Sequence, residues 1–239
     1  MITALIFAGG TGERMNTRTK PKQFLELHGK PIIIHTIEHF EDHPLVDNII
    51  VVCLESWINE CRRLLKRNFI KKVKWIVPGG NTGQESIFNG LNAIKDICED
   101  DTIVLIHDGV RPLITQELIT ENIKSVEKHG SAISVSYATE TIVTIDNKTK
   151  VEAIPNREQT RITKAPQTFY YKDIWEAHTK AKNDGLDNML DSATLMNHYG
   201  YTLHTVLSSP YNIKITSPSD YYVFRAIYEA KENSQIFGL

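Results

Sequence analysis

The sequence predicts an α/β protein built on a doubly wound, mostly parallel sheet. Strand-like, loop-like and helix-like segments alternate four times in the first 130 residues, which is typical of such a sheet. Glycines follow several of the strand-like runs, at the edge where these sheets bind ligands. The 239 residues are 41% hydrophobic and 23% charged, enough for a buried core, and no linker-like tract interrupts them. We therefore expect one domain over 1–239.

Four short apolar runs bounded by turn residues predict buried parallel strands. They occupy 2–8, 48–53, 73–77 and 102–106. Amphipathic spacing predicts helices at 31–40, 57–69, 85–97, 115–129 and, near the end of the chain, 219–231. Thr115 is the expected N-cap of the fourth helix. The loops after Phe7, Val77 and Ile106 follow strand ends, so we expect the ligand site among them.

The segment 140–157 departs from this alternation. Two β-rich runs, 141–145 and 150–154, flank a polar turn and predict a hairpin. An isolated two-stranded hairpin is only marginally stable in water, so it needs a surface to lie against. We favour an arm that reaches a second subunit over a hairpin that lies on its own domain.

Composition excludes several classes of protein. With 27 basic and 29 acidic residues the net charge is −2, which argues against general nucleic-acid binding. No stretch approaches the roughly 18 apolar residues of a membrane span, so no membrane partner is expected. Three cysteines at 53, 61 and 98 fit no metal-binding spacing and indicate reduced thiols, hence a cytoplasmic protein.

The first chemical motif is the run AGGTGERM at 8–15, followed by PKQ at 21–23. Glycines let backbone N–H groups approach an anion, and the cations Arg14 and Lys22 flank the loop. The run lacks the Gly-Lys-Ser/Thr of a P-loop and the third glycine of a dinucleotide fingerprint. We interpret it as a triphosphate site; the alternative is a strand-to-helix turn with solvated charges.

A second motif, HDGVRP at 107–112, ends a predicted buried strand. Asp108 could hold Mg²⁺ while the metal bridges phosphates, although a strand-end Asp is as often a turn or cap residue. His107 is expected to be structural rather than a metal ligand.

Three weaker signals complete the set. The loop GGNTGQES at 79–86 could wrap a base or a ribose, or be a plain loop. Lys214, in a predicted strand at 212–216, could contact phosphate or merely extend its charge to solvent. Arg157 follows the hairpin and could clamp a second phosphate in a bidentate manner.

Taken in order, the motifs AGGTGERM–PKQF, GGNTGQES, HDGVRP, IPNR–APQTF and NIKIT resemble those of the cytidylyltransferases that act on sugar-alcohol phosphates. That group includes the methylerythritol-phosphate and ribitol-5-phosphate enzymes, and the resemblance runs from residue 2 to about residue 227. It implies a Rossmann-like nucleotidyltransferase fold, Mg²⁺ dependence, and a homodimer built through an exchanged β-arm at 140–157.

The resemblance also implies roles for individual residues. Arg14 and Lys22 would hold the CTP phosphates, and Lys214 would approach the α-phosphate. Asp108 would bind Mg²⁺, and Arg157 of the partner's arm would grip the polyol phosphate. The remaining substrate-binding residues, mostly around the cytidine, would be Ala8, Gly9, Gly10, Gly12, Gly80, Ser86 and Arg111.

The chain departs from the usual pattern at Gly83, where many relatives have Arg, and at Ala165, where they have Thr. Tyr211 stands where the methylerythritol branch has Asp. This last difference, with Val110 and the IPNR form, resembles the ribitol branch. We therefore expect transfer of CMP from CTP to D-ribitol 5-phosphate, giving CDP-ribitol and pyrophosphate. The alternatives are 2-C-methyl-D-erythritol 4-phosphate as acceptor, a non-catalytic nucleotide-sensing module and, disfavoured by the missing third glycine, an NAD-dependent dehydrogenase.

Overall fold

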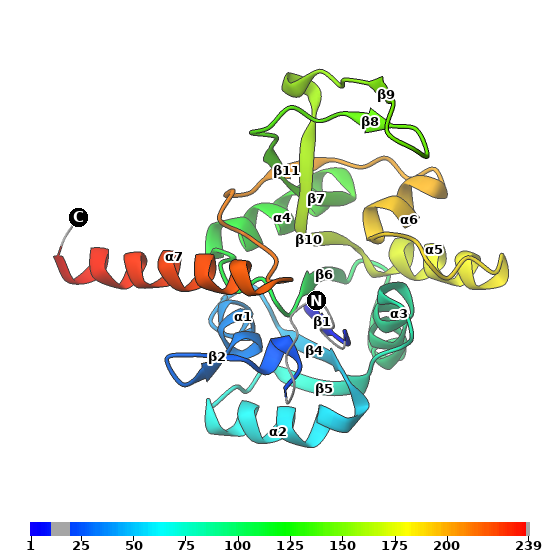
Figure 1. Ribbon diagram of the computed structural model, residues 1–239. Helices are drawn as coiled ribbons and strands as arrows, with labels where there is room; N and C mark the ends of the chain where they lie inside the picture. Colours follow the sequence, from blue (N-terminus) through cyan, green and yellow to red (C-terminus); the bar gives the residue numbers. More distant parts are fainter. Residues whose placement is uncertain (11–19, 238–239) are drawn as a thin grey trace.

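A central sheet organises the computed structural model, which describes residues 1–10 and 20–237 (Figure 1). Within those residues the sheet has seven strands in the order β11-β7-β10-β6-β1-β4-β5. The strands are β1 (Ile2–Ala8), β4 (Asn48–Cys53), β5 (Val73–Pro78), β6 (Ile103–Asp108), β7 (Ser131–Tyr137), β10 (Arg161–Tyr170) and β11 (Thr205–Leu207). Neighbours pair in parallel, except that β10 runs antiparallel to both β6 and β7. The predicted mostly parallel α/β sheet is confirmed.

Helices cover both faces of the sheet, as the alternating pattern predicts. Apolar side chains of α1 (Ile32–Glu41), α2 (Ile58–Arg67) and α4 (Gln116–His129) form one core cluster with one face of the sheet. Those of α3 (Gly83–Ala93), α5 (Tyr171–Asn183) and α6 (Ser192–His198) form a second cluster on the other face. Side chains alternate along β1, so Ala4 and Ile6 join the first cluster and Leu5 the second.

The predicted helix ends are correct to within a few residues, and caps explain the shifts. Thr115 accepts a hydrogen bond from the Leu118 N–H, so this predicted N-cap is confirmed. Helix α3 begins two residues before its predicted start because Thr82 caps it, accepting from the Glu85 N–H. Helix α2 follows a short 3-10 turn, η3 (Glu55–Trp57). The last helix, α7 (Pro218–Phe237), is longer than predicted.

The hairpin at 140–157 is present but shorter than predicted. Its strands, β8 (Thr144–Ile145) and β9 (Val151–Ala153), pair antiparallel in a small sheet of their own. Asp146 closes the turn by accepting backbone hydrogen bonds from Lys148 and Lys150. The hairpin projects beyond the central sheet, at the top of Figure 1.

The predicted strand at 212–216 is wrong: this segment has no regular secondary structure. It crosses the loop that follows β6 instead of joining a sheet. The Ile215 N–H donates to the Val110 carbonyl, and the Asn212 carbonyl accepts from Arg111, so no ladder partner remains for it. The other small elements are β2 (Glu26–Leu27), β3 (Lys30–Pro31), η2 (Lys22–Phe24) and η4 (Arg157–Gln159).

Across 1–10 and 20–237, none of the helices combines the length and apolar composition needed to cross a membrane.

Candidate active site

Loops after three parallel strands meet at one edge of the sheet. A Cβ added to Gly9, after β1, would lie 3.0 Å from the Ser86 hydroxyl oxygen and 3.5 Å from the Cα of Gly79, after β5. A Cβ on Gly109, after β6, would lie 2.9 Å from the Ala8 Cβ. The approach at Gly109 is closer than a Cβ allows, and the one between Gly9 and Ser86 is tighter than most Cβ contacts, so the glycines let the three loops pack closely.

Gln23 fixes the start of the glycine loop. Its buried side-chain amide donates to the carbonyl oxygens of Ala8, at 2.6 Å, and Gly10, at 3.2 Å. Lys22, the preceding residue, lines the cavity that this loop borders and that is described next. The predicted site residues Gly12 and Arg14 lie outside the described residues.

The loop after β5 is held by Ser86 in the first turn of α3. The Ser86 hydroxyl accepts from the Gly80 N–H at 3.0 Å and donates to the Thr82 carbonyl at 2.9 Å. With the glycine loop, this segment encloses a cavity of about 320 Å³. We call it the glycine-loop cavity; it is lined by Phe7, Ala8, Gly9, Gly10, Lys22, Gln23, Gly80, Asn81, Thr82, Gly83, Ser86, Asp108, Val110 and Lys214.

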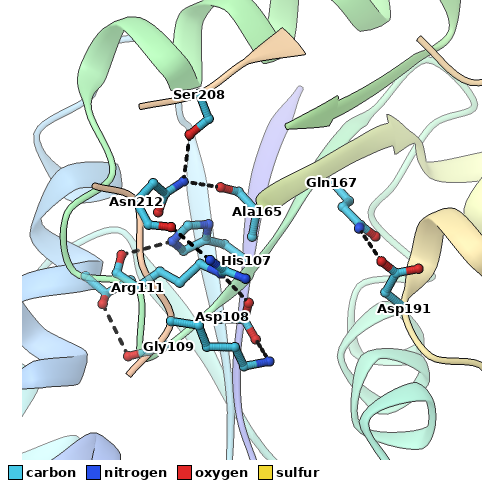
Figure 2. Close-up of polar contacts among 11 residues, drawn as sticks. His107, Asp108, Gly109, Arg111, Ala165, Gln167, Asp191, Ser208 and Asn212 are labelled. Carbon is cyan, nitrogen blue, oxygen red and sulfur yellow. Dashed lines mark hydrogen bonds and ion pairs between the residues drawn. The ribbon is translucent and has the colours of Figure 1, made fainter. Parts of the chain in front are cut away.

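Asp108, the last residue of β6, lies in the middle of the site with both carboxylate oxygens occupied. Arg111 Nε donates to one oxygen at 2.7 Å, and Lys214 Nζ to the other at 2.6 Å (Figure 2). Burial by itself would raise the pKa of Asp108, but the charges and hydrogen bonds of Lys214 and Arg111 outweigh it and hold the pKa at about 2. The carboxylate is therefore ionised at neutral pH.

Asn212 ties this corner together, although the sequence analysis did not single it out. Its carbonyl accepts from Arg111 Nη1 at 2.9 Å, and its side-chain amide donates to the Ala165 carbonyl at 2.6 Å (Figure 2). The same amide also donates to the Ser208 hydroxyl at 3.1 Å. The segment that carries Lys214 is thus anchored to the loop after β6 and to β10. The signal available in the sequence was a polar residue two positions before Lys214 in an otherwise apolar run.

His107 is fully buried next to Asp108. Its Nε2 lies 3.3 Å from the Arg111 carbonyl, and burial lowers its pKa to about 3, so it is neutral. This position agrees with the structural role expected from the sequence.

A second cavity, of about 300 Å³, adjoins the first. The two share Phe7, Gly83, Asp108 and Lys214, so they meet at the Asp108–Lys214 ion pair. We call the second one the side-chain cavity; its other lining residues are Gln84, Ile87, Ile106, Arg111, Thr163, Lys164, Ala165, Gln167, His178, Met189, Leu190, Asp191, Ser192 and Leu195.

Gln167 braces the far wall of the side-chain cavity. Its amide donates to Asp191 at 2.8 Å (Figure 2). Its carbonyl oxygen accepts from the Ala193 N–H at 2.9 Å. Asp191 in turn caps α6 by accepting from the Thr194 N–H. Both polar residues were missed because they come from β10 and from the loop before α6, 24 residues apart in the chain.

Comparison with known proteins assigns the chain to a family. The family described as IspD, 2-C-methyl-D-erythritol 4-phosphate cytidylyltransferase, matches residues 2–230. The chain belongs to this cytidylyltransferase family.

Relatives of this cytidylyltransferase span its whole length. A protein of Vibrio parahaemolyticus named ribitol-5-phosphate cytidylyltransferase is 51% identical over 238 residues, covering 100% of both chains. One of Clostridium botulinum named 2-C-methyl-D-erythritol 4-phosphate cytidylyltransferase is 36% identical, covering 95% of this chain and 97% of that one. The crystal structure of 4-diphosphocytidyl-2C-methyl-D-erythritol synthase from Anaerococcus prevotii matches with a TM-score of 0.82 and 26% identity, over 95% of this chain and 96% of that one. The chain is therefore an enzyme that transfers CMP from CTP, and its second substrate is a sugar phosphate.

The three departures noted in the sequence have different surroundings. Gly83 opens α3 and lines both cavities, and buried Ala165 lines the side-chain cavity. Tyr211 is 58% exposed and lines neither. Arg157 lies on η4, exposed at the base of the hairpin, and lines neither cavity of its own subunit.

The residues at the cavity junction fit a magnesium ion that arrives with a nucleotide. In the described part of the chain, no three His, Cys, Asp or Glu side chains are grouped as a complete metal site. Asp108 supplies one carboxylate where the cavities meet, and Mg²⁺ is usually held by one or two carboxylates together with substrate phosphates. Such an ion would take a carboxylate oxygen that Lys214 contacts in this structure.

Proposed function

We propose that this enzyme joins CTP to a polyol phosphate, D-ribitol 5-phosphate in the first place, and forms CDP-ribitol and pyrophosphate. The observation that carries the choice of acceptor is the full-length similarity to the ribitol-5-phosphate cytidylyltransferase of Vibrio parahaemolyticus. The site supports a two-substrate reaction because two adjoining cavities share one ion pair.

The reaction needs no nucleophile from the protein, because a phosphate monoester is already ionised at neutral pH. An oxygen of the acceptor phosphate forms a bond to the α-phosphorus of CTP. The bond from that phosphorus to the oxygen bridging to the β-phosphate breaks, and pyrophosphate leaves with the electron pair. Catalysis then depends on alignment and on positive charge around the reacting phosphorus.

Each group has a place in this scheme. CTP occupies the glycine-loop cavity, where Ser86 and Gly80 lie near the cytidine and Lys22, with Arg14, holds the triphosphate. The acceptor occupies the side-chain cavity. Lys214, at the junction, stabilises charge on the α-phosphate as it reacts. Arg111 keeps Asp108 ionised and oriented.

Magnesium completes the scheme as a proposed cofactor. Asp108 would hold the ion, which when bound neutralises negative charge on the phosphates. Lys214 would then transfer its contact from Asp108 to phosphate oxygen.

The hairpin is proposed to be a dimerisation arm that brings Arg157 to the partner's acceptor site. Its apolar side chains are exposed, among them Val143, Ile145, Val151 and Ile154, and need a surface to cover them. We also place the enzyme in the cytoplasm, a location supported by its three free cysteines.

The decisive experiment supplies enzyme, CTP and Mg²⁺ with one polyol phosphate at a time and measures pyrophosphate release. We expect the highest kcat/KM with D-ribitol 5-phosphate and none with unphosphorylated ribitol. Preference for 2-C-methyl-D-erythritol 4-phosphate would assign the enzyme to that reaction instead. Tight CTP binding without pyrophosphate release from any acceptor would favour a nucleotide sensor.

Mixing two inactive variants tests the arm. If Arg157 acts across the dimer, Arg157→Ala mixed with Lys22→Ala recovers activity, because a mixed dimer has one site with both native residues. Random exchange of subunits gives about a quarter of wild-type activity, since half of the dimers are mixed. Tagged pull-down verifies the exchange. Activity that stays at the level of the parents would place Arg157 within its own subunit.

A further inference from the structure

Lys164 enters the side-chain cavity from an irregular stretch of β10. Arg161–Thr163 pair with β7 in one register, and pairing resumes in another at Gln167, which also pairs with β6. The residues between them, 164–166, leave the ladder as a bulge. Bulges re-aim side chains, and here Lys164 is half-buried and lines the cavity.

The cavity has two other cations, and both are ion-paired. Arg111 and Lys214 share the carboxylate of Asp108. The side chain of Lys164 forms neither a hydrogen bond nor an ion pair with any residue in 1–10 and 20–237. Burial lowers its pKa, and the nearby charge of Arg111 lowers it further. A half-buried ammonium group with no anionic partner is the kind of group that an anionic ligand stabilises.

The charges that line the cavity favour an anionic ligand. Lys164, Arg111 and Lys214 carry three positive charges and Asp108 and Asp191 carry two negative charges, so one positive charge is in excess. Asp191 lies on the other wall, with its oxygens engaged by Gln167 and by the start of α6. A phosphate monoester carries about two negative charges at neutral pH.

We propose that Lys164 binds the phosphate of the polyol phosphate, from the same subunit as Asp108. The inference rests on the proposed two-substrate function and adds a phosphate ligand that needs no partner subunit. Lys164 lines the side-chain cavity and not the glycine-loop cavity, so its role is with the acceptor rather than with the triphosphate. Together with Arg111, it would hold the acceptor phosphate beside the junction where the α-phosphorus reacts.

Steady-state kinetics of Lys164→Gln test this role. We expect the KM for D-ribitol 5-phosphate to rise about 10- to 100-fold, as for the loss of one charge-assisted hydrogen bond, with the KM for CTP unchanged. Lys164→Arg keeps the charge and should stay close to wild type. Lys172→Gln, which removes an exposed lysine on α5, is the matched control and should change neither constant.

Two results would overturn the proposal. One is an unchanged acceptor KM in a Lys164→Gln variant that melts at the wild-type temperature. The other is a rise in the KM for CTP instead, which would assign Lys164 to the triphosphate.

Calorimetric titration separates this inference from the function on which it rests. D-ribitol 5-phosphate and unphosphorylated ribitol are each titrated into wild type and Lys164→Gln, without turnover. Weaker binding of only the phosphorylated compound to the variant supports Lys164 as a phosphate ligand, even if wild type forms no CDP-ribitol. Equal affinity of both proteins for D-ribitol 5-phosphate contradicts it, even if wild type is fully active.

Discussion

The glycine-loop cavity and the side-chain cavity lie on two sides of one ion pair but are built from different materials. Four glycines line the first, and Gln23 and Ser86 hold its two loops. A single glycine lines the second, whose residues come mostly from α3, β6, β10, α5, α6 and the loop before α6. Backbone N–H groups can bind the phosphates and the base of a nucleotide that is the same in every turnover. Side chains, in contrast, can be chosen by shape and polarity to bind one particular polyol.

This difference separates two kinds of specificity within one active site. The glycine-loop cavity, proposed to bind the nucleotide, depends on the path of the backbone, so it appears in the sequence as glycine motifs. The acceptor side depends on which side chains face a shared space, so it leaves only scattered residues in the sequence. Substitutions on the two sides should therefore affect different kinetic constants.

The largest effect is expected from the two lysines assigned to the reacting phosphates. Lys22→Ala and Lys214→Ala should each lower kcat by about 10²-fold or more, because each removes a preorganised positive charge from the reacting phosphates. Stopped assays of pyrophosphate at saturating CTP and acceptor measure the change, with Lys172→Ala as control. Near-normal turnover in both variants would contradict the roles given to these lysines.

Ionisation of Asp108, between the two cavities, should make the stability of the fold depend on pH. The pKa of Asp108 is depressed to about 2, from an ordinary value of 3.8. Its contribution is therefore fully present above pH 4 and is lost as the pH falls toward 2. The loss should be about 2 kcal/mol of unfolding free energy.

Urea unfolding between pH 5 and pH 2, compared with Asp108→Asn, measures this contribution. If that variant does not fold, carbon NMR of the Asp108 carboxyl in the wild type gives the same information. A midpoint near 3.8 would show that the ion pairs with Arg111 and Lys214 do not act on it.

A substitution of Gln167 is expected to act on the acceptor side alone. Gln167→Leu leaves Asp191 and the Ala193 N–H without their partner, which should loosen the wall formed by α6. We expect the acceptor KM to rise about tenfold and the unfolding free energy to fall by about 1–3 kcal/mol. The KM for CTP serves as the internal control, and an equal rise in both constants would contradict the division between the cavities.

The smallest effect is expected on the nucleotide side. Ser86→Ala removes the hydroxyl that accepts from the Gly80 N–H and donates to the Thr82 carbonyl, so the loop after β5 loses two hydrogen bonds. The KM for CTP should rise about fivefold, equivalent to about 1 kcal/mol, while the acceptor KM stays constant. Ser219→Ala, on the exposed first turn of α7, is the matched control. A change confined to the acceptor KM would reverse the assignment of the cavities.

Prediction from the sequence succeeded where local pattern and fold agree. The apolar runs that became β1, β4 and β6 are buried strands, because continuous hydrophobicity bounded by turns has few other stable outcomes. The run that became β5 is a strand as predicted, but it lies at the edge of the sheet and none of its residues is fully buried, so the prediction of its burial is wrong. The segment 212–216 has a similar apolar pattern. Its backbone groups, however, form hydrogen bonds with the Val110 carbonyl and the Arg111 side chain instead of with a neighbouring strand. Propensity cannot show which partner a backbone group will find.

The sequence by itself determined the four parallel strands β1, β4, β5 and β6, the edge where the candidate site lies, and the glycine loops, since these follow from periodicity and from the backbone freedom of glycine. Only the tertiary structure decided that Asp108 is shared by Arg111 and Lys214, and that Gln167 and Asp191 close a second cavity. Lys214 lies 106 residues beyond Asp108 in the chain, and no local rule relates residues so far apart. Their contact depends on how the irregular segment around Asn212 crosses the end of β6, which is a property of packing.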